Sequence, residues 1–241
     1  MGQVITDVGI DMDGVVYPFM EAFKDWCKKK LNRASLPDPI HWNFYEDWGL
    51  DEETFKSYVR EAAETASVFK VLAPYEGTVQ AWRDLRDLNV RIHVLTARPH
   101  SAWVQTIEWL FIHGLHCDSL HFTNTKSMLS KLNSGKALLI DDHVAYYEEA
   151  ERNGIIPVLM SRPWNLSKEG ATRVSDLNGL VSFIRGYNLS QKNSSILEMT
   201  PPKQFIKTSP YTKTFPDIEP DPYKIHQPRK DMDKWMKPYH G

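Results

Sequence analysis

The sequence has little cysteine, no strong excess of charge and no long hydrophobic run. Its two cysteines, Cys27 and Cys117, have neither the spacing of metal ligands nor a disulfide framework, so we interpret them as isolated thiols. The net charge of -2 argues against a nucleic-acid-binding or membrane-surface protein. No apolar run approaches the roughly 18 residues of a membrane span, and no basic region precedes an apolar core near Met1. We therefore expect a cytoplasmic protein without membrane association.

Length and composition are those of an ordinary globular chain, except near the C-terminus. The 241 residues, 41% of them apolar, suit one domain with an insertion or two small domains. Residues 190–241 hold eight of the fifteen prolines and nine Lys plus Arg against six Asp plus Glu. A proline-rich segment without apolar periodicity is typical of a tail that is disordered or lies over the surface. A binding partner for this tail, and a homodimer, are left open.

Two carboxylates follow the first apolar run of the sequence. Residues 4–11 have the pattern of a strand that ends in Asp11, and Asp13 and Gly14 follow closely. Side chains two residues apart on extended backbone point to the same side, and a glycine lets the chain turn sharply. A plain turn is one interpretation of such a segment. A functional pair is the other, because two like charges held this close need a cation or a proton between them.

Two further apolar runs end in polar residues of the same kind. Residues 137–140 precede Asp141 and Asp142, and residues 90–95 precede Thr96. If the three strands lie parallel in one sheet, these side chains converge at its carboxyl edge, where ligands bind in α/β proteins. This recurrence favours the functional interpretation of the first acidic pair.

Strand and helix patterns alternate along most of the chain. Strands are expected near 4–11, 90–95, 119–122, 137–140 and 155–160, and helices near 76–88, 101–113, 126–132, 143–153 and 176–187. The alternation predicts an α/β protein with a Rossmann-like, mainly parallel sheet and helices on both faces. Residues 17–75 instead hold two aromatic-rich helical patterns. They predict a small helical cap inserted after the first strand, with residues 1–16 and 76–189 forming the core.

This set of motifs resembles that of the haloacid dehalogenase superfamily of aspartyl-phosphate hydrolases. Its four motifs would be residues 11–15, Thr96, a lysine before the fourth strand, and residues 141–142. Together they span residues 11–142 and are specific as a set, although each alone is weak. The resemblance implies a phosphoric monoester hydrolase.

The first motif supplies the chemistry that hydrolysis of a phosphate ester needs. Our hypothesis is that Asp11 attacks phosphorus and forms an aspartyl-phosphate, a covalent route open to carboxylates. Asp13 would protonate the leaving oxygen and later take a proton from the attacking water. The resemblance assigns the same roles to these two positions.

Carboxylates without neighbouring His or Cys suit Mg²⁺, which prefers oxygen ligands. By the resemblance, Asp11 and Asp141 would bind the ion through their side chains and Asp13 through its backbone carbonyl. Asp142 would support it through a water molecule or from outside the ligand shell. Mg²⁺ is therefore the expected cofactor.

The phosphoryl group needs donors and a cation. We expect the Thr96 hydroxyl and neighbouring backbone N–H groups, that of Ala97 included, to bind it where a helix begins. Three lysines, Lys126, Lys131 and Lys136, lie between the third and fourth strands. Lys126 is preferred because it follows a strand end closely, and Lys131 is the alternative.

Within the superfamily, the sequence most resembles the 5'(3')-deoxyribonucleotidases. This narrower match rests on residues 11–15, Phe19, the Trp42 loop, residues 123–126 and residues 163–165. In that family the equivalent aromatic residues line the base and sugar pocket, so Phe19 and Trp42 are candidates for stacking on a nucleobase.

The segment after Thr96 departs from the family pattern. Ala97 stands where mammalian members have serine, and Arg98 follows. The guanidinium of Arg98 is a candidate for substrate binding, either to phosphate in bidentate fashion or to a different substrate.

We expect a Mg²⁺-dependent phosphomonoesterase that acts on a small phosphate ester, most simply a deoxyribonucleoside monophosphate. Alternatives are a phosphatase of nucleic-acid 3' ends, another small-molecule phosphatase of the superfamily, and a non-catalytic protein that binds through its tail. The aromatic cap and the acidic charge outside the tail speak against a nucleic-acid end, which needs an open, basic approach.

Overall fold

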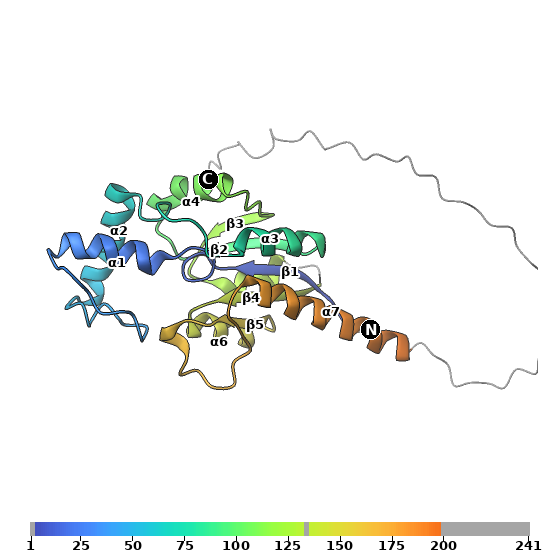
Figure 1. The fold of residues 1–241 in the computed structure, drawn as a ribbon. Coiled ribbons are helices and arrows are strands. Elements are labelled where there is room, and N and C mark those ends of the chain that lie inside the picture. The colour runs from blue at the N-terminus through green and yellow to red at the C-terminus, as the bar shows by residue number, and fades with distance from the viewer. Residues whose placement is uncertain (1–2, 133–134, 199–241) are drawn as a thin grey trace, which may run out of the picture. The chain divides into compact units, whose positions relative to one another are not determined.

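A six-stranded sheet forms the centre of the computed structural model, which describes residues 3–132 and 135–198. The strands are β1 (Ile5–Ile10), β2 (Arg91–Thr96), β3 (Ser119–Phe122), β4 (Lys136–Asp141), β5 (Ile156–Met160) and β6 (Arg173–Val174). Their order is β3-β2-β1-β4-β5-β6, and the five pairings in the described residues are parallel. The expected mainly parallel α/β fold is confirmed, and β1 lies in the middle of the sheet (Figure 1).

Alternate residues of the central strands face opposite sides of the sheet and enter two apolar clusters. Leu138 of β4 belongs to the larger cluster and Leu139 to the smaller one, as expected for side chains that alternate across a strand. Helices α3 (Thr78–Asp87), α4 (Trp103–Ile112) and α7 (Leu177–Glu198) contribute to the larger cluster. Helices α5 (Leu129–Leu132) and α6 (Val144–Arg152) contribute to the smaller one. Helices therefore cover both faces of the sheet.

Parallel pairing brings the carboxyl ends of three strands together. Ile10 lies beside Val94 of β2 and Ile140 of β4, and the backbone N–H of Asp11 donates to the Ile140 carbonyl at 3.1 Å. At the other end of β1, Asn188 of α7 holds the backbone of Ile5: its Oδ1 accepts from the Ile5 N–H at 2.7 Å and its Nδ2 donates to the Ile5 carbonyl. The position of β1 is thus fixed along its whole length.

Residues 17–75, which we call the helical insertion, contain helices α1 (Phe19–Lys30) and α2 (Glu52–Ala66). The side chain of Asp51 accepts from the Thr54 N–H at 2.7 Å, so it caps the N-terminus of α2. Aromatic rings pack between the two helices: the ring centroids of Phe23 in α1 and Phe55 in α2 are 5.6 Å apart. The two helices contact each other and lie together beyond the carboxyl end of β1 (Figure 1).

Some details differ from the sequence-based expectation. The two-residue strand β6 was not predicted, and the helix expected from residue 101 begins as a 3₁₀ turn, His100–Ala102, before α4. Helix α7 continues to Glu198, beyond the expected end of the core at residue 189. The rest of the proline-rich tail, and with it any binding partner of the tail, lies outside the described residues. Among the described helices, none combines the length and apolar character needed to cross a membrane.

Candidate active site

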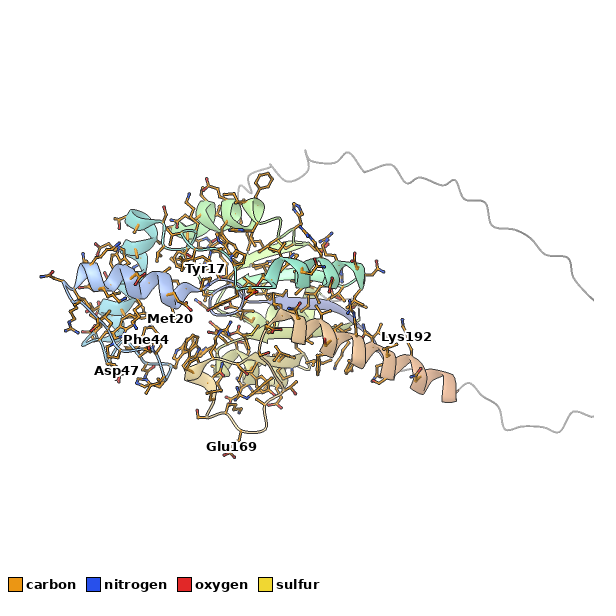
Figure 2. The ribbon with its side chains drawn as sticks, in the orientation of Figure 1. Tyr17, Met20, Phe44, Asp47, Glu169 and Lys192 are labelled. Atoms are coloured by element: carbon orange, nitrogen blue, oxygen red, sulfur yellow. The ribbon has the colours of Figure 1, made fainter. Side chains whose placement is uncertain are left out.

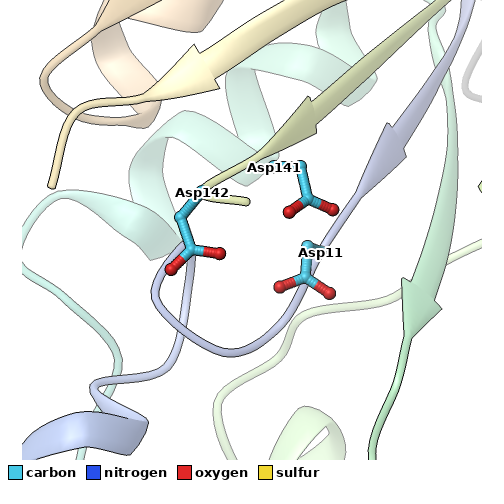
Figure 3. A group of neighbouring side chains, drawn as sticks. All are labelled: Asp11, Asp141 and Asp142. Atoms are coloured by element: carbon cyan, nitrogen blue, oxygen red, sulfur yellow. The ribbon is translucent and has the colours of Figure 1, made fainter. Parts of the chain in front are cut away.

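Three buried carboxylates meet at the carboxyl edge of the sheet. Asp11 follows β1, Asp141 ends β4 and Asp142 follows it, and one oxygen of each lies within 4.8 Å of the others. Figure 3 shows the three carboxylates gathered close to one another. The convergence expected from the sequence is therefore present, and it results from the pairing of β1 with β4.

Lys126 neutralises part of this acidic cluster. It starts the short 3₁₀ helix Lys126–Met128 and is almost fully buried. Its Nζ donates to Asp11 Oδ1 at 2.5 Å and also to Asp141 Oδ2. Of the other two candidate lysines, Lys131 is exposed and Lys136 donates to the Gly154 carbonyl. The structure thus places Lys126, the preferred candidate, at the carboxylates.

Burial and mutual repulsion shift the pKa values of the cluster. Burial raises the pKa of the Asp11 carboxyl to about 7; Lys126 opposes this rise, and Asp141 and Asp13 add to it. Burial, with Asp141 and Asp11 nearby, also raises the pKa of Asp142 well above its ordinary range. Burial lowers the pKa of the Lys126 ammonium, but Asp11 and Asp141 outweigh that effect and the net shift is upward.

The donor set fits a divalent cation. With three ionised carboxylates and one ammonium, the buried cluster carries an excess of two negative charges, which is costly in a low-dielectric site. A divalent ion would cancel that excess, and carboxylate oxygens are hard ligands of the kind that Mg²⁺, Mn²⁺ and Ca²⁺ prefer.

Asp142 is held by the turn after β1 and by residues after β5. Trp164 Nε1 donates to Asp142 Oδ2 at 3.1 Å, and Asn165 Nδ2 donates to the Asp142 carbonyl at 2.8 Å. Gly14 has φ +78, and a Cβ at this position would lie 2.0 Å from Asp142 Oδ2. Glycine is therefore required at residue 14 both for its backbone conformation and for the space that Asp142 occupies.

Asp13 and Arg98 form an ion pair across the site. Arg98 Nη2 donates to Asp13 Oδ1 at 2.7 Å, and Nε donates to Oδ2 at 2.9 Å. The Arg98 side chain is fully buried, whereas that of Asp13 is 23% exposed. The sequence predicted a guanidinium that binds substrate; in the structure the guanidinium pairs with Asp13, and Arg98 is also among the residues that line the cavity above the carboxylates.

The two phosphate-binding candidates after β2 differ in their accessibility. Thr96 is fully buried, and its hydroxyl accepts from the backbone N–H of Arg98 at 3.3 Å. Ala97 is exposed and lines the cavity above the carboxylates, whereas Thr96 does not. The structure thus brings Ala97, but not the Thr96 hydroxyl, to the cavity surface.

A cavity of about 500 Å³ lies between the carboxylates and the helical insertion. Both aromatic candidates line it. Phe19 stacks on Phe69 with ring centroids 5.2 Å apart, and Trp42 stacks on His143 at 3.6 Å. The cavity is thus lined by charged side chains at the edge of the sheet and by largely apolar side chains of the helical insertion.

The family model described as "5' nucleotidase, deoxy (Pyrimidine), cytosolic type C protein" matches residues 3–187, well over half of the chain. The chain belongs to this family. As a member of the cytosolic type C 5'-nucleotidase family, it is a phosphatase that hydrolyses phosphate monoesters. The nucleotidase family, predicted from residues 11–15, Phe19, the Trp42 loop, residues 123–126 and residues 163–165, is therefore confirmed.

Individual relatives agree with this assignment. A Chlorobaculum tepidum protein named "Putative 5'(3')-deoxyribonucleotidase" is 24% identical over 169 residues, which cover 66% of this chain and 80% of that protein. A solved structure described as a predicted phosphatase from Clostridium acetobutylicum has a TM-score of 0.56 at 18% identity and covers 76% of this chain and 99% of its own. The structure of a phosphonoacetaldehyde hydrolase-like protein from Oleispira antarctica has a TM-score of 0.56 at 14% identity. The match covers 80% of this chain and 95% of that protein. At these identities the two structures support the fold alone.

Several residues that line this cavity were not assigned from the sequence. They are Met20, Tyr45, Val59 and Arg60 of the helical insertion, and Asn124, His143, Tyr146 and Trp164 of the core, all of which line the cavity. The sequence did contain a signal for Trp164, because residues 163–165 contributed to the family resemblance. Those of the insertion had none, since its aromatic and apolar side chains also form its own interior.

Proposed function

We propose that the chain is a Mg²⁺-dependent 5'(3')-deoxyribonucleotidase that works through an aspartyl-phosphate on Asp11. The observation that carries this proposal is the buried cluster of Asp11, Asp141, Asp142 and Lys126, which opens into a cavity roofed by aromatic side chains. Membership of the nucleotidase family and the relative named as a deoxyribonucleotidase support the choice of substrate.

The first half of the reaction transfers the phosphoryl group to the protein. A carboxylate oxygen of Asp11 attacks phosphorus, the new O–P bond forms, and the bond from phosphorus to the leaving oxygen breaks. Asp13, which has to take up a proton from water before this step, donates that proton to the leaving oxygen, so the nucleoside leaves as an alcohol and Asp13 is left ionised. Lys126, already bonded to Asp11, offsets the repulsion between the carboxylates and the incoming phosphate.

The second half returns Asp11 to its starting state. Water attacks the phosphorus of the aspartyl-phosphate while Asp13, now ionised, takes a proton from it. The O–P bond to Asp11 breaks and inorganic phosphate leaves. Ala97 borders the cavity, and we assign phosphate binding in both halves to its backbone N–H, to Lys126 and, after a local rearrangement, to the Thr96 hydroxyl.

The metal ligands follow from the donor set. We assign Asp11 and Asp141 as side-chain ligands, Asp13 as a backbone-carbonyl ligand and Asp142 as a supporting residue. The ion-paired Asp13 carboxylate is compatible with a carbonyl ligand at that residue. When bound, Mg²⁺ would neutralise the cluster and draw charge from the phosphoryl oxygens.

The helical insertion serves in this proposal as a cap over the reacting groups. It would exclude water from the aspartyl-phosphate and supply the nucleoside pocket. Phe19 and Trp42, which both line the cavity, would contact the base and the sugar. The stack of Trp42 on His143 must then open, or stay as one wall of the pocket.

Phosphate release tests the proposal directly. We expect Mg²⁺-dependent, chelator-sensitive release from deoxyribonucleoside 5'- and 3'-monophosphates, and little from ribonucleotides, a 3'-phosphorylated oligonucleotide or an aryl phosphate. Asp11→Asn should lower turnover by at least about 10³-fold, in line with loss of a covalent nucleophile. Asp38→Asn is the control, because Asp38 is an exposed carboxylate paired with Lys24 in the helical insertion. Preferential release from the oligonucleotide, or an active Asp11→Asn variant, would refute the proposal.

A further inference from the structure

Arg98 is committed to the proposed acid–base residue through several contacts. Its Nε lies 3.1 Å from Asp13 Oδ1 and 2.9 Å from Oδ2, and its Nη2 lies 2.7 Å from Oδ1. Both oxygens of Asp13 therefore face one planar group of donors. Such a pairing fixes the orientation of a carboxylate as well as its position, which a single hydrogen bond does not.

The rest of the Arg98 side chain is held equally firmly. Its Nη1 donates to the Phe69 carbonyl and to Thr106 Oγ1, and its guanidinium carbon lies 4.9 Å from the centre of the Tyr17 ring and 4.6 Å from that of Phe69. The side chain is fully buried. A buried guanidinium with four of its five N–H groups engaged has little freedom to leave Asp13 for a phosphate.

These contacts join Asp13 to both ends of the helical insertion. Tyr17 lies at its start, where the chain leaves the sheet (Figure 2), and its hydroxyl donates to the Val68 carbonyl at 2.5 Å. Phe69 lies near its end. Arg98 thus touches both connections of the insertion to the core and the carboxylate of Asp13 at the same time.

We propose that Arg98 is a positioning residue, which orients the Asp13 carboxylate toward the leaving oxygen and the attacking water. This inference rests on the proposed function, because it takes Asp13 as the group that moves the proton. Arg98 does not bind phosphate in this scheme. Its effect on the reaction passes through Asp13, whose 23% exposed side chain faces the cavity.

A double-mutant cycle separates this role from a structural one. Arg98→Met keeps an apolar stem against Tyr17 and Phe69 and removes the donors to Asp13. We expect it to lower kcat about 10²-fold with KM changed less than about 3-fold, since general acid–base catalysis contributes about 10²–10⁴. In an Asp13→Asn background the same change should have almost no further effect, because the group on which Arg98 acts is gone. Arg98→Lys should restore little of kcat, since an ammonium lacks the planar pair of donors.

Lys70→Met is the matched control. Lys70 follows Phe69, and its Nζ pairs with Glu108 of α4 at 2.5 Å, so it also ties the insertion to the core but does not contact Asp13. Its kcat should equal that of the wild type. Equal losses from Lys70→Met and Arg98→Met, or additive losses in the cycle, would overturn the proposal in favour of a structural tie. A large rise in KM and in the inhibition constant of inorganic phosphate would instead make Arg98 a phosphate ligand.

Two features of the experiment separate the test of Arg98 from the test of the substrate assignment. The cycle is run with whichever alkyl phosphate ester the wild type hydrolyses fastest, so a wrong substrate assignment leaves the comparison of variants intact. A crystal structure of the Arg98→Met variant tests the orientation without any assay of activity. We expect the Asp13 carboxylate to rotate or to occupy more than one position there; an unchanged Asp13 would refute the positioning role.

Discussion

Lys126 faces two carboxylates in a buried site, and this geometry distinguishes it from the other lysines near β4. Removing its ammonium leaves three carboxylates with no cation among the described side chains of the cluster, which is unfavourable for approach of a phosphate dianion. Lys131, which the sequence left as the alternative, is exposed on α5.

The two lysines give a direct prediction at the scale of single residues. Lys126→Ala should lower kcat/KM by about 10²–10³-fold, as removal of a group that stabilises transition-state charge does, whereas Lys131→Ala should stay within about 2-fold. Steady-state phosphate release measures both. A greater loss in the Lys131 variant would transfer the assignment to that residue.

At the scale of elements, the turn that follows β1 couples the backbone of the first motif to Asp142. Gly14 has a left-handed backbone conformation and leaves room for the Asp142 carboxylate. Gly154, between α6 and β5, also has a positive φ, +69, but an added Cβ would meet nothing within 4 Å. A side chain at either glycine would strain the backbone. Only a side chain at residue 14 would also collide with Asp142.

This pair yields a controlled prediction. Both Gly14→Ala and Gly154→Ala should lower the free energy of unfolding by about 1–2 kcal/mol through backbone strain. Gly14→Ala should in addition displace Asp142, with at least about 10-fold weaker activation by Mg²⁺, while Gly154→Ala should keep the wild-type response. Chemical denaturation and Mg²⁺ titration of phosphate release provide the two measurements. An identical Mg²⁺ response in both variants would contradict the assigned role of Asp142.

The same elements show what the sequence could predict. Apolar runs that end in Asp11, Thr96 and Asp141 located three strands and their common edge, because parallel pairing aligns strand ends. The partner of Arg98 could not be read from the sequence, since the side chain reaches Asp13 across 85 positions of chain. The Thr96 hydroxyl was expected to face phosphate, but it is used locally by the Arg98 N–H. Strand β6 has two residues, too few for a periodic pattern.

At the scale of the whole molecule, the buried carboxylates link folding to pH and to metal. The pKa of Asp11 rises from an ordinary 3.8 to about 7 in the folded protein without metal. Between these values the folded state holds a proton that the unfolded state has lost. The contribution of Asp11 to the free energy of unfolding is therefore fully present below about pH 4. It falls as the pH rises and is lost once the pH has passed about 7.

A divalent cation should reverse this loss, because it binds the ionised carboxylates. We expect saturating Mg²⁺ to raise the melting temperature more at pH 8 than at pH 5, and Asp11→Asn to weaken this pH dependence. Thermal unfolding followed by circular dichroism, with Mg²⁺ or with chelator, measures the difference. Equal shifts at both pH values would show that protons and metal do not compete at the cluster.

The central place of β1 in the sheet affects how the chain is made. This strand leaves the ribosome before either of its neighbours, since one edge pairs with β2 and the other with β4, and Asn188 completes the bonding of Ile5. At about 5–20 residues per second, on the order of 10 s of synthesis separates β1 from its second neighbour. During that interval the apolar strand has an unpaired edge, which can pair with other chains and cause aggregation. Dilution or chaperones must prevent this pairing until β4 is made.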